Sequence, residues 1–144
     1  MIDKHIVYLS LGSNLGDRKL LLQKAIMNIG KKIGKVVRQS SFLETKPWGF
    51  ESKNMFLNAC LCVSTSMTPH ELLAATQSIE KDMGRKKKSK DGKYDDRIID
   101  IDILLYDHIK LNDPDLTIPH PYMKQRDFVM KPLKEIMSSD GLGK

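Results

Sequence analysis

Residues 96–106, with the sequence DRIIDIDILLY, are the most informative stretch for both the fold and the chemistry. Aliphatic residues alternate there with carboxylates, and this period of two is typical of a β-strand with one buried face. Asp100 and Asp102 are predicted to share one face. The other face is predicted to carry four aliphatic side chains, Ile99, Ile101, Ile103 and Leu105. We therefore expect a strand that packs on helices through one face and presents two carboxylates on the other.

The two carboxylates suit a hard cation. Residues two apart on one strand face are separated by roughly 7 Å, so their side chains can converge on one ion or bracket two. Mg²⁺ prefers oxygen ligands and is usually held by one or two carboxylates plus substrate phosphates. A strand whose outer face is merely hydrated is the alternative, because Asp is depleted in strands but not excluded from them. The basic run RKKKSKDGK at 85–93 favours the metal site, because dense positive charge beside a metal suits phosphoryl transfer.

Composition narrows the class of protein. With 144 residues, 40% of them hydrophobic, the chain is expected to form a single domain, 1–144. The formal net charge of +6 favours an anionic partner, and the concentration of basic residues in one loop favours a small polyanion over nucleic acid. No apolar run is long enough to span a bilayer and no signal-peptide pattern is present, so we expect a cytoplasmic protein without a membrane partner. Cys60 and Cys62 are expected to be buried or half-buried thiols.

The order of the elements predicts an α+β fold. Before the strand at 96–106 we expect a strand at 6–11 that ends in a turn at 12–17, a helix, strands at 36–45 and 55–64, and a helix from 69 toward 84. Thr68, Pro69 and Glu71 form a capping-box signal for the second helix. Short helices follow toward the C-terminus. This order is that of a ferredoxin-like antiparallel sheet with two helices on one face, which leaves the opposite face free for a site.

The predicted strand at 55–64 repeats the two-faced pattern. Its odd-numbered positions from 57 to 63 are apolar, whereas Phe56 and Asn58 lie on the other face. An aromatic ring and an amide are suited to stacking on and hydrogen bonding to a flat heterocycle, although core packing is the alternative role for Phe56. Phe56 and Asn58 are expected to share their face with Asp100 and Asp102.

Motifs spread along nearly the whole chain resemble one enzyme family. They are LSLGSN at 9–14, FLNA at 56–59, DIDI at 100–103 and PHPYMKQRDFV at 119–129. In this order they resemble the 6-hydroxymethyl-7,8-dihydropterin pyrophosphokinases (2-amino-4-hydroxy-6-hydroxymethyldihydropteridine diphosphokinases) of folate biosynthesis. The resemblance implies an ATP-dependent diphosphokinase that transfers pyrophosphate from ATP to the hydroxymethyl group of a reduced pterin, releases AMP and uses two Mg²⁺ ions.

The resemblance also implies roles for individual residues. Asp100 and Asp102 would hold the metals, and Arg85 and Arg97 would stabilise the transferring group while the basic loop closes as a lid. The pterin would be bound by Thr45, Trp48, Phe56, Asn58 and Phe128. ATP would be bound by Gln77, Glu80, Arg85, Lys87, Arg97, Ile103, Thr117, His120 and Arg126. Lys87 stands where the family commonly has arginine, and lysine keeps the charge but loses the planar fork.

Two other functions fit part of the pattern. Ferredoxin-like sheets also bind RNA, but the Lys/Arg-Gly-Phe type of strand motif that stacks bases is missing from this sequence. A different ATP-using transferase with a metal-binding Asp-x-Asp pair would differ in its acceptor. We expect small-molecule substrates, ATP and the reduced pterin, and a monomer. Because some members of the family are fused to neighbouring folate enzymes, the chain could also be one piece of a longer product.

Overall fold

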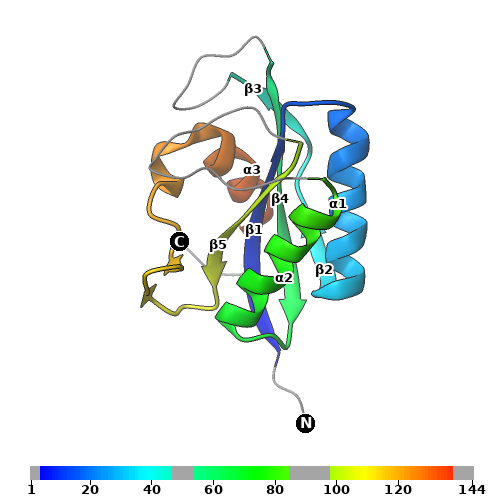
Figure 1. The fold of residues 1–144 in the computed structure, drawn as a ribbon. Coiled ribbons are helices and arrows are strands. Elements are labelled where there is room, and N and C mark those ends of the chain that lie inside the picture. The colour runs from blue at the N-terminus through cyan, green and yellow to red at the C-terminus, as the bar shows by residue number, and fades with distance from the viewer. Residues whose placement is uncertain (1–3, 47–53, 85–97, 138–144) are drawn as a thin grey trace.

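A computed structural model describes residues 4–46, 54–84 and 98–137 of the chain. Its centre is an antiparallel sheet in the order β2-β4-β1-β5, made of β1 (His5–Ser13), β2 (Gly34–Gln39), β4 (Phe56–Thr65) and β5 (Asp100–Tyr106). A short strand, β3 (Leu43–Thr45), also pairs with β4. The predicted α+β, ferredoxin-like arrangement is confirmed (Figure 1).

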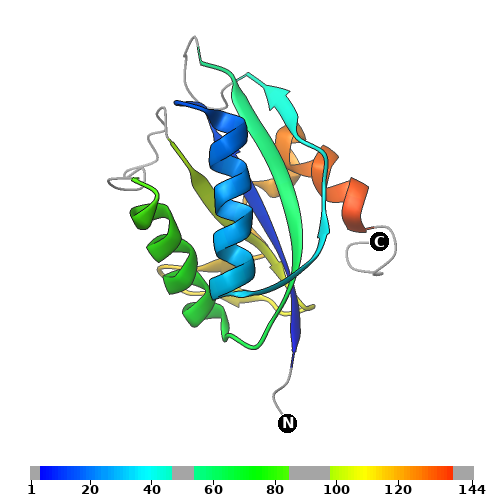
Figure 2. The same cartoon turned by 90° about the vertical axis from the view of Figure 1, so that its right-hand side faces the viewer.

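Helices cover both faces of this sheet. Helices α1 (Arg18–Lys32) and α2 (Pro69–Asp82) lie side by side on one face, and α3 (Asp127–Met137) lies on the other, as Figures 1 and 2 show from two directions. The face opposite α1 and α2 was expected to be free. In the structure α3 covers part of it, and the exposed part of this face is therefore smaller than the sequence predicted.

The helix-start signals act as predicted. The Asp17 side chain accepts a hydrogen bond from the Leu20 backbone N–H at 3.2 Å and caps α1. At the start of α2 the Thr68 hydroxyl accepts from the Glu71 N–H at 3.2 Å, and the Glu71 carboxylate accepts from the Thr68 N–H at 2.8 Å. Both signals work because the first N–H groups of a helix have no partner within the helix itself.

Two apolar cores stabilise the sheet, one on each face. The larger core joins α1 and α2 to the sheet, and it includes Ile101 and Ile103 of β5. The smaller core joins α3 to the sheet, through Tyr8, Cys60, Cys62, Leu104, Met123, Val129, Leu133 and Ile136. Both cysteines are buried thiols, within the expectation. Burial raises the pKa of the Cys60 thiol, so the thiol stays protonated. It donates a hydrogen bond to the Val129 carbonyl oxygen of α3, 3.6 Å from its Sγ.

The predicted face pattern of β5 is right for its first half and wrong for its end. Between Tyr8 and Leu9 the register of β1 against β5 shifts, because Tyr8 pairs with Leu105 whereas Leu9 pairs with Ile103. Leu104 is thus the extra residue of a β-bulge, and a bulge reverses the alternation of the side chains that follow it. Leu105 packs against the core under α3 and not with Ile103, contrary to the expectation.

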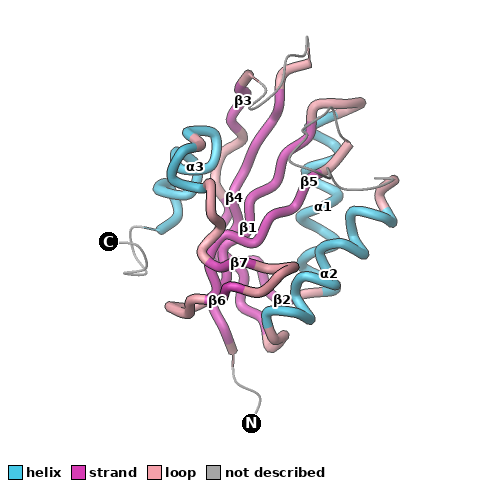
Figure 3. Tube along the Cα trace, turned by 60° about the vertical axis from the view of Figure 1, so that its left-hand side comes forward, coloured by secondary structure: helices cyan, strands magenta, loops and turns pink. Residues whose placement is uncertain are grey.

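Three further differences concern element boundaries. The strand expected at 36–45 is split into β2 and β3, because Ser40 interrupts it with a side-chain bond from the Cys60 N–H to its hydroxyl at 2.9 Å. The turn expected at 12–17 begins later, since β1 includes Gly12 and Ser13. A small hairpin of β6 (Leu111–Asn112) and β7 (Thr117–Ile118) follows β5, as the backbone trace in Figure 3 shows. A 3₁₀ turn, Met123–Gln125, precedes α3.

Among the residues that the structure describes, none of the helices has the length and apolar character needed to cross a membrane.

Candidate active site

A row of three residues crosses the sheet at one end. Gly12 of β1 pairs with Asn58 of β4 on one side and with Asp100 of β5 on the other. Residues in register across a sheet point to the same face, and neighbouring strands lie about 4.8 Å apart, so Asn58 and Asp100 are about 10 Å from each other across Gly12. The next row on this face is Cys60, Ser10 and Asp102. The expected grouping of Asn58 with both aspartates is therefore confirmed.

Gly12 leaves the middle of this row without a side chain. A Cβ atom at position 12 would lie 3.2 Å from the Asn58 Oδ1 and 3.5 Å from the Phe56 Cδ1. These distances place Asn58 and Phe56 directly beside the bare backbone of Gly12. The sequence reasoning missed this role, because it assigned Gly12 to a turn. The signal that could have found it is the glycine within an otherwise β-branched and aliphatic strand, which often marks close approach of a ligand.

The Asn58 amide is held in one orientation. Its Nδ2 donates to the Thr45 Oγ1 at 2.8 Å and to the Leu43 carbonyl at 3.2 Å, which uses both hydrogens of the group. Its Oδ1 consequently faces Gly12 as a hydrogen-bond acceptor. Because Thr45 also pairs with Phe56 across β3 and β4, the structure brings together three of the residues expected to bind a pterin.

Asp100 and Asp102 are half-buried and lie on the polar face, while Ile101 and Ile103 between and after them are buried in the opposite core. Carboxylate oxygens are the ligands that Mg²⁺ prefers. The donor set of this strand therefore fits such an ion.

Glu80 contacts the same strand from α2. Its side chain is 3% exposed, and its Oε2 accepts a hydrogen bond from the Ile101 N–H at 2.7 Å. Since β5 is an edge strand, this carboxylate satisfies an N–H that β1 cannot reach. Glu80, expected to bind ATP, thus also fixes the backbone between the two aspartates.

The segment before α3 places an arginine among aromatic rings. The Arg126 Cζ lies 5.7 Å from the ring centroids of both Tyr122 and Phe128, and Arg126 is 7% exposed. A guanidinium near two rings is stabilised by cation–π attraction. The neighbouring His120 is tied to β5, because its N–H donates to the Leu104 carbonyl at 3.0 Å. The expected residues Phe128, Arg126 and His120 are therefore anchored to each other or to β5.

The remaining predicted residues divide into two groups. Ile103 is buried, Thr117 is half-buried on β7, and Gln77 is exposed on α2. Four others lie outside the described residues: Trp48, Arg85, Lys87 and Arg97, and with them the basic loop.

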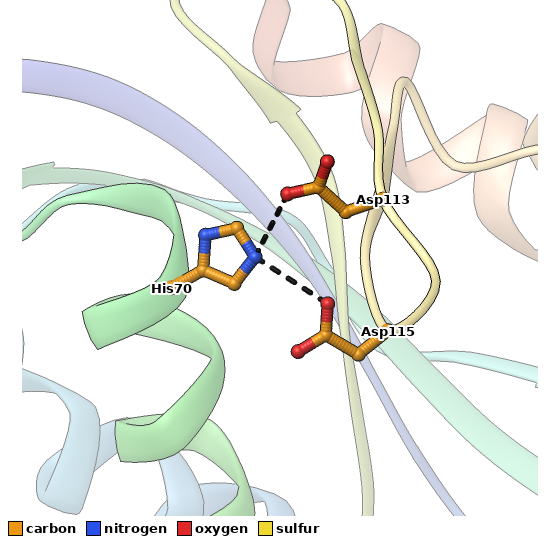
Figure 4. Close-up of side chains that lie close together, drawn as sticks. All are labelled: His70, Asp113 and Asp115. Carbon is orange, nitrogen blue, oxygen red and sulfur yellow. Dashed lines mark ion pairs between the residues drawn. The ribbon is translucent and has the colours of Figure 1, made fainter.

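A second group of potential metal ligands lies at the other end of the sheet, beyond the ends of β4 and β5 (Figure 4). The His70 Nε2 lies 3.1 Å from the Asp113 Oδ2 and 3.4 Å from the Asp115 Oδ1. Each residue offers one ligand atom, and these atoms lie within 4.8 Å of one another, so the group could hold a metal ion. His70 and Asp115 are exposed, and the sequence reasoning did not single out this group.

Comparison with known proteins agrees with the geometry. Residues 8–138 match the model of the family described as 7,8-dihydro-6-hydroxymethylpterin-pyrophosphokinase. The chain is 50% identical over 132 residues to the 2-amino-4-hydroxy-6-hydroxymethyldihydropteridine pyrophosphokinase of Porphyromonas gingivalis, which covers 91% of this chain and 90% of that protein. It is also 43% identical over 135 residues to the folic acid synthesis protein fol1 of Pneumocystis carinii, covering 94% of this chain but 18% of that longer protein.

The fold has solved counterparts as well. The HPPK-DHPS of Plasmodium falciparum superposes with a TM-score of 0.70 at 20% identity, over 92% of this chain and 40% of that one. At this identity the likeness concerns the fold. Related sequences thus occur both alone and within longer proteins. The family model spans most of the chain and a curated relative shares half of its residues, so this chain belongs to the 7,8-dihydro-6-hydroxymethylpterin-pyrophosphokinase family.

Proposed function

We propose that the chain carries out the reaction of its family on the row formed by Asn58, Gly12 and Asp100. As a pyrophosphokinase it transfers a pyrophosphoryl group from ATP to 6-hydroxymethyl-7,8-dihydropterin in folate biosynthesis, giving the pterin diphosphate and AMP. The observation that carries the assignment to this row is the register, which sets an amide suited to the pterin and a carboxylate suited to the metal on either side of a bare glycine.

The pterin is proposed to bind at the Asn58 end. With its amide hydrogens already used by Thr45 and Leu43, Asn58 offers its Oδ1 to an N–H on the edge of the heterocycle. Phe56 and Phe128 supply flat apolar surfaces from β4 and α3, and aromatic faces stabilise a planar ring by offset stacking. Trp48 is proposed to assist from outside the described residues.

Asp100 and Asp102 are proposed to hold the two Mg²⁺ ions. Both residues are half-buried, their Cα atoms lie about 7 Å apart along the strand, and Glu80 keeps the backbone between them in place. Bound Mg²⁺ would neutralise charge on the phosphate oxygens of ATP. The aspartates would set where those phosphates lie relative to the pterin hydroxymethyl group. Asp100 is about 10 Å from Asn58 across the sheet, a distance that a triphosphate can span.

ATP is proposed to lie along the outer edge of β5. The residues proposed to surround it are Gln77, Glu80, Ile103, Thr117, His120 and Arg126. Arg85, Lys87 and Arg97 are also proposed to bind ATP, and Arg85 and Arg97 to stabilise the transferring group, because phosphoryl transfer depends mainly on positioning and on neutralising charge on oxygens. It stays a prediction that the chain forms a single domain and acts as a cytoplasmic monomer. Whether it acts alone or as part of a longer folate enzyme also stays open.

A nucleotide product assay tests the function. The purified protein is incubated with Mg²⁺ and ATP, with and without freshly reduced hydroxymethylpterin, and the nucleotides and pterins are separated. We expect AMP only when the pterin is present, in equal amount to a pterin diphosphate. ADP as the product, or AMP formation independent of the pterin, would contradict the proposal.

A further inference from the structure

Two polar contacts connect the C-terminal turn of α3 to β2 and to the segment that follows β2. The Arg38 Nε of β2 donates to the Ile136 carbonyl at 2.8 Å, one of the carbonyls that have no partner inside a helix. A cation at this position also interacts favourably with the negative end of the helix dipole. Glu135 accepts from the Ser41 N–H at 2.7 Å and from the Ser41 hydroxyl at 2.9 Å.

Ser41, the partner of Glu135, directly follows a residue that is hydrogen-bonded to β4. Ser40, 3% exposed, donates its N–H to the Cys60 carbonyl at 3.0 Å and accepts from the Cys60 N–H at 2.9 Å. Cys60 lies two residues after Asn58 on the same face of β4. Ser41 therefore lies in the connection between β2 and β3, next to the residue that is bonded to this point of β4 and just before β3, which contains Thr45. The contact between Ser41 and Glu135 joins α3 to the segment that holds the Asn58 amide.

The apolar contacts of α3 do not by themselves fix the position and tilt of the helix on the sheet. Val129, Leu133 and Ile136 pack on Tyr8, Cys60 and Cys62, and burial of apolar area is non-directional. A helix could therefore slide or tilt on this surface at small cost. Directional hydrogen bonds at one end restrict that movement, and Phe128 lies about 10 Å along the axis from Glu135 at 1.5 Å per residue. A small tilt of α3 about its C-terminal end therefore displaces Phe128, near the N-terminal end, by a larger distance than it displaces Glu135.

We propose that Glu135, through Ser41, and Arg38, through Ile136, are positioning residues for the pterin, because they set the distance between Phe128 on α3 and Asn58 on β4. The proposal rests on the proposed function, which assigns the pterin to these two residues. Neither Glu135 nor Arg38 touches substrate in this account. They act on how well the preformed site matches a flat ring, so they affect pterin binding more strongly than ATP binding.

The test compares Ser41→Ala, Glu135→Ala and the double variant. KM for the reduced pterin is measured at saturating ATP, and pterin affinity is measured by fluorescence titration with a non-hydrolysable ATP analogue present. We expect Glu135→Ala to weaken pterin binding roughly three- to tenfold, the range for loss of a hydrogen-bonded contact, with a smaller change in KM for ATP. The double variant should be no weaker than Glu135→Ala, because Ser41→Ala removes only the hydroxyl's hydrogen bonds to Glu135, which Glu135→Ala already removes.

Conservative variants separate positioning from general stability. Glu135→Gln keeps one acceptor oxygen and should recover part of the pterin affinity, whereas Arg38→Lys, which keeps the charge but cannot reproduce the guanidinium geometry, should weaken pterin binding. Lys134→Ala, an exposed neighbour on the same turn, is the matched control and should match the unsubstituted protein. All assays run well below the unfolding temperature of the least stable variant.

The outcomes are distinct. A lowered unfolding temperature with unchanged pterin affinity, or equal losses for pterin and ATP, would overturn the positioning role. Additive losses in the double variant would overturn the contact between Ser41 and Glu135 as its cause. Failure of the unsubstituted protein to bind the pterin would instead contradict the proposed function itself.

Discussion

Gly12 and Asn58 face each other across β1 and β4, and a methyl group on residue 12 would approach the Asn58 Oδ1 to 3.2 Å. Such a contact is tight but tolerable, because the side chain of Asn58 can move by a few tenths of an ångström. The closeness means that the amide proposed to recognise the pterin has no spare space beside it.

Gly12→Ala is therefore expected to raise KM for the pterin several-fold while the free energy of unfolding changes by less than about 1 kcal/mol. Steady-state kinetics at saturating ATP and urea unfolding check the two halves of this prediction. Gly30→Ala is the matched control, since a Cβ there meets nothing within 4 Å and lies in the interior of α1. It should stabilise the protein by about 0.5–1 kcal/mol without a change in kinetics. If KM for the pterin is unaltered in Gly12→Ala, the proposal that Asn58 binds the pterin is contradicted.

Arg126→Lys tests the guanidinium between Tyr122 and Phe128. Lysine keeps the charge but loses the planar group that lies 5.7 Å from both ring centroids. Because a partly desolvated cation–π contact contributes about 1–2 kcal/mol, we expect KM for ATP to rise several-fold, with Lys124→Ala as an exposed control nearby. Kinetics of Arg126→Lys indistinguishable from those of the unsubstituted enzyme would mean that charge alone matters here.

Leu133→Ala tests the core under α3. Leu133 is 0% exposed and packs on the face of the sheet opposite α1 and α2, so truncation leaves a cavity and should lower the free energy of unfolding by about 2–5 kcal/mol. Leu20→Ala, at a leucine that is 44% exposed, should cost much less. Urea denaturation of both variants makes the comparison, and equal losses would contradict the packing described for α3.

The capping box of α2 predicts a pH dependence of stability. Hydrogen bonds from the Thr68 N–H and hydroxyl lower the pKa of Glu71, so its ionised form is favoured in the folded state. Its contribution is then fully present above the unfolded pKa of about 4.3 and is lost as pH falls through the lower folded pKa. The difference in unfolding free energy between the unsubstituted protein and Glu71→Gln should be constant near neutral pH and shrink below about pH 4. A difference that stays the same down to about pH 3 would be inconsistent with this linkage.

Much of the site could be predicted from the sequence because its side chains follow a period of two. Asp100, Asp102, Phe56 and Asn58 alternate with aliphatic residues, so the strand pattern alone separates them from the core. Gly12 carries no side chain, and the hydropathy pattern that revealed its neighbours cannot reveal a residue whose role is to leave space.

Other features depend on partners distant in the chain. The bulge at Leu104 is defined by the pairing of β1 with β5, and the leucine that breaks the alternation at this position does not by itself specify a bulge. The break between β2 and β3 depends on Ser40 meeting Cys60. The sequence also gave no sign of which sheet face α3 would cover, since an amphipathic helix has an apolar stripe but does not specify its partner.

The most direct test of the account is the Mg²⁺-dependent rate of pterin-dependent AMP formation in Asp100→Asn and Asp102→Asn, compared with the unsubstituted chain. Asparagine keeps the shape of each side chain and removes the charge that would hold the metal, so circular dichroism spectra should be unchanged. We predict a loss of rate of roughly a thousandfold or more in each variant, which corresponds to about 4 kcal/mol of transition-state stabilisation. Turnover within about tenfold of the unsubstituted chain in either variant would contradict the assignment of the metal site to this strand.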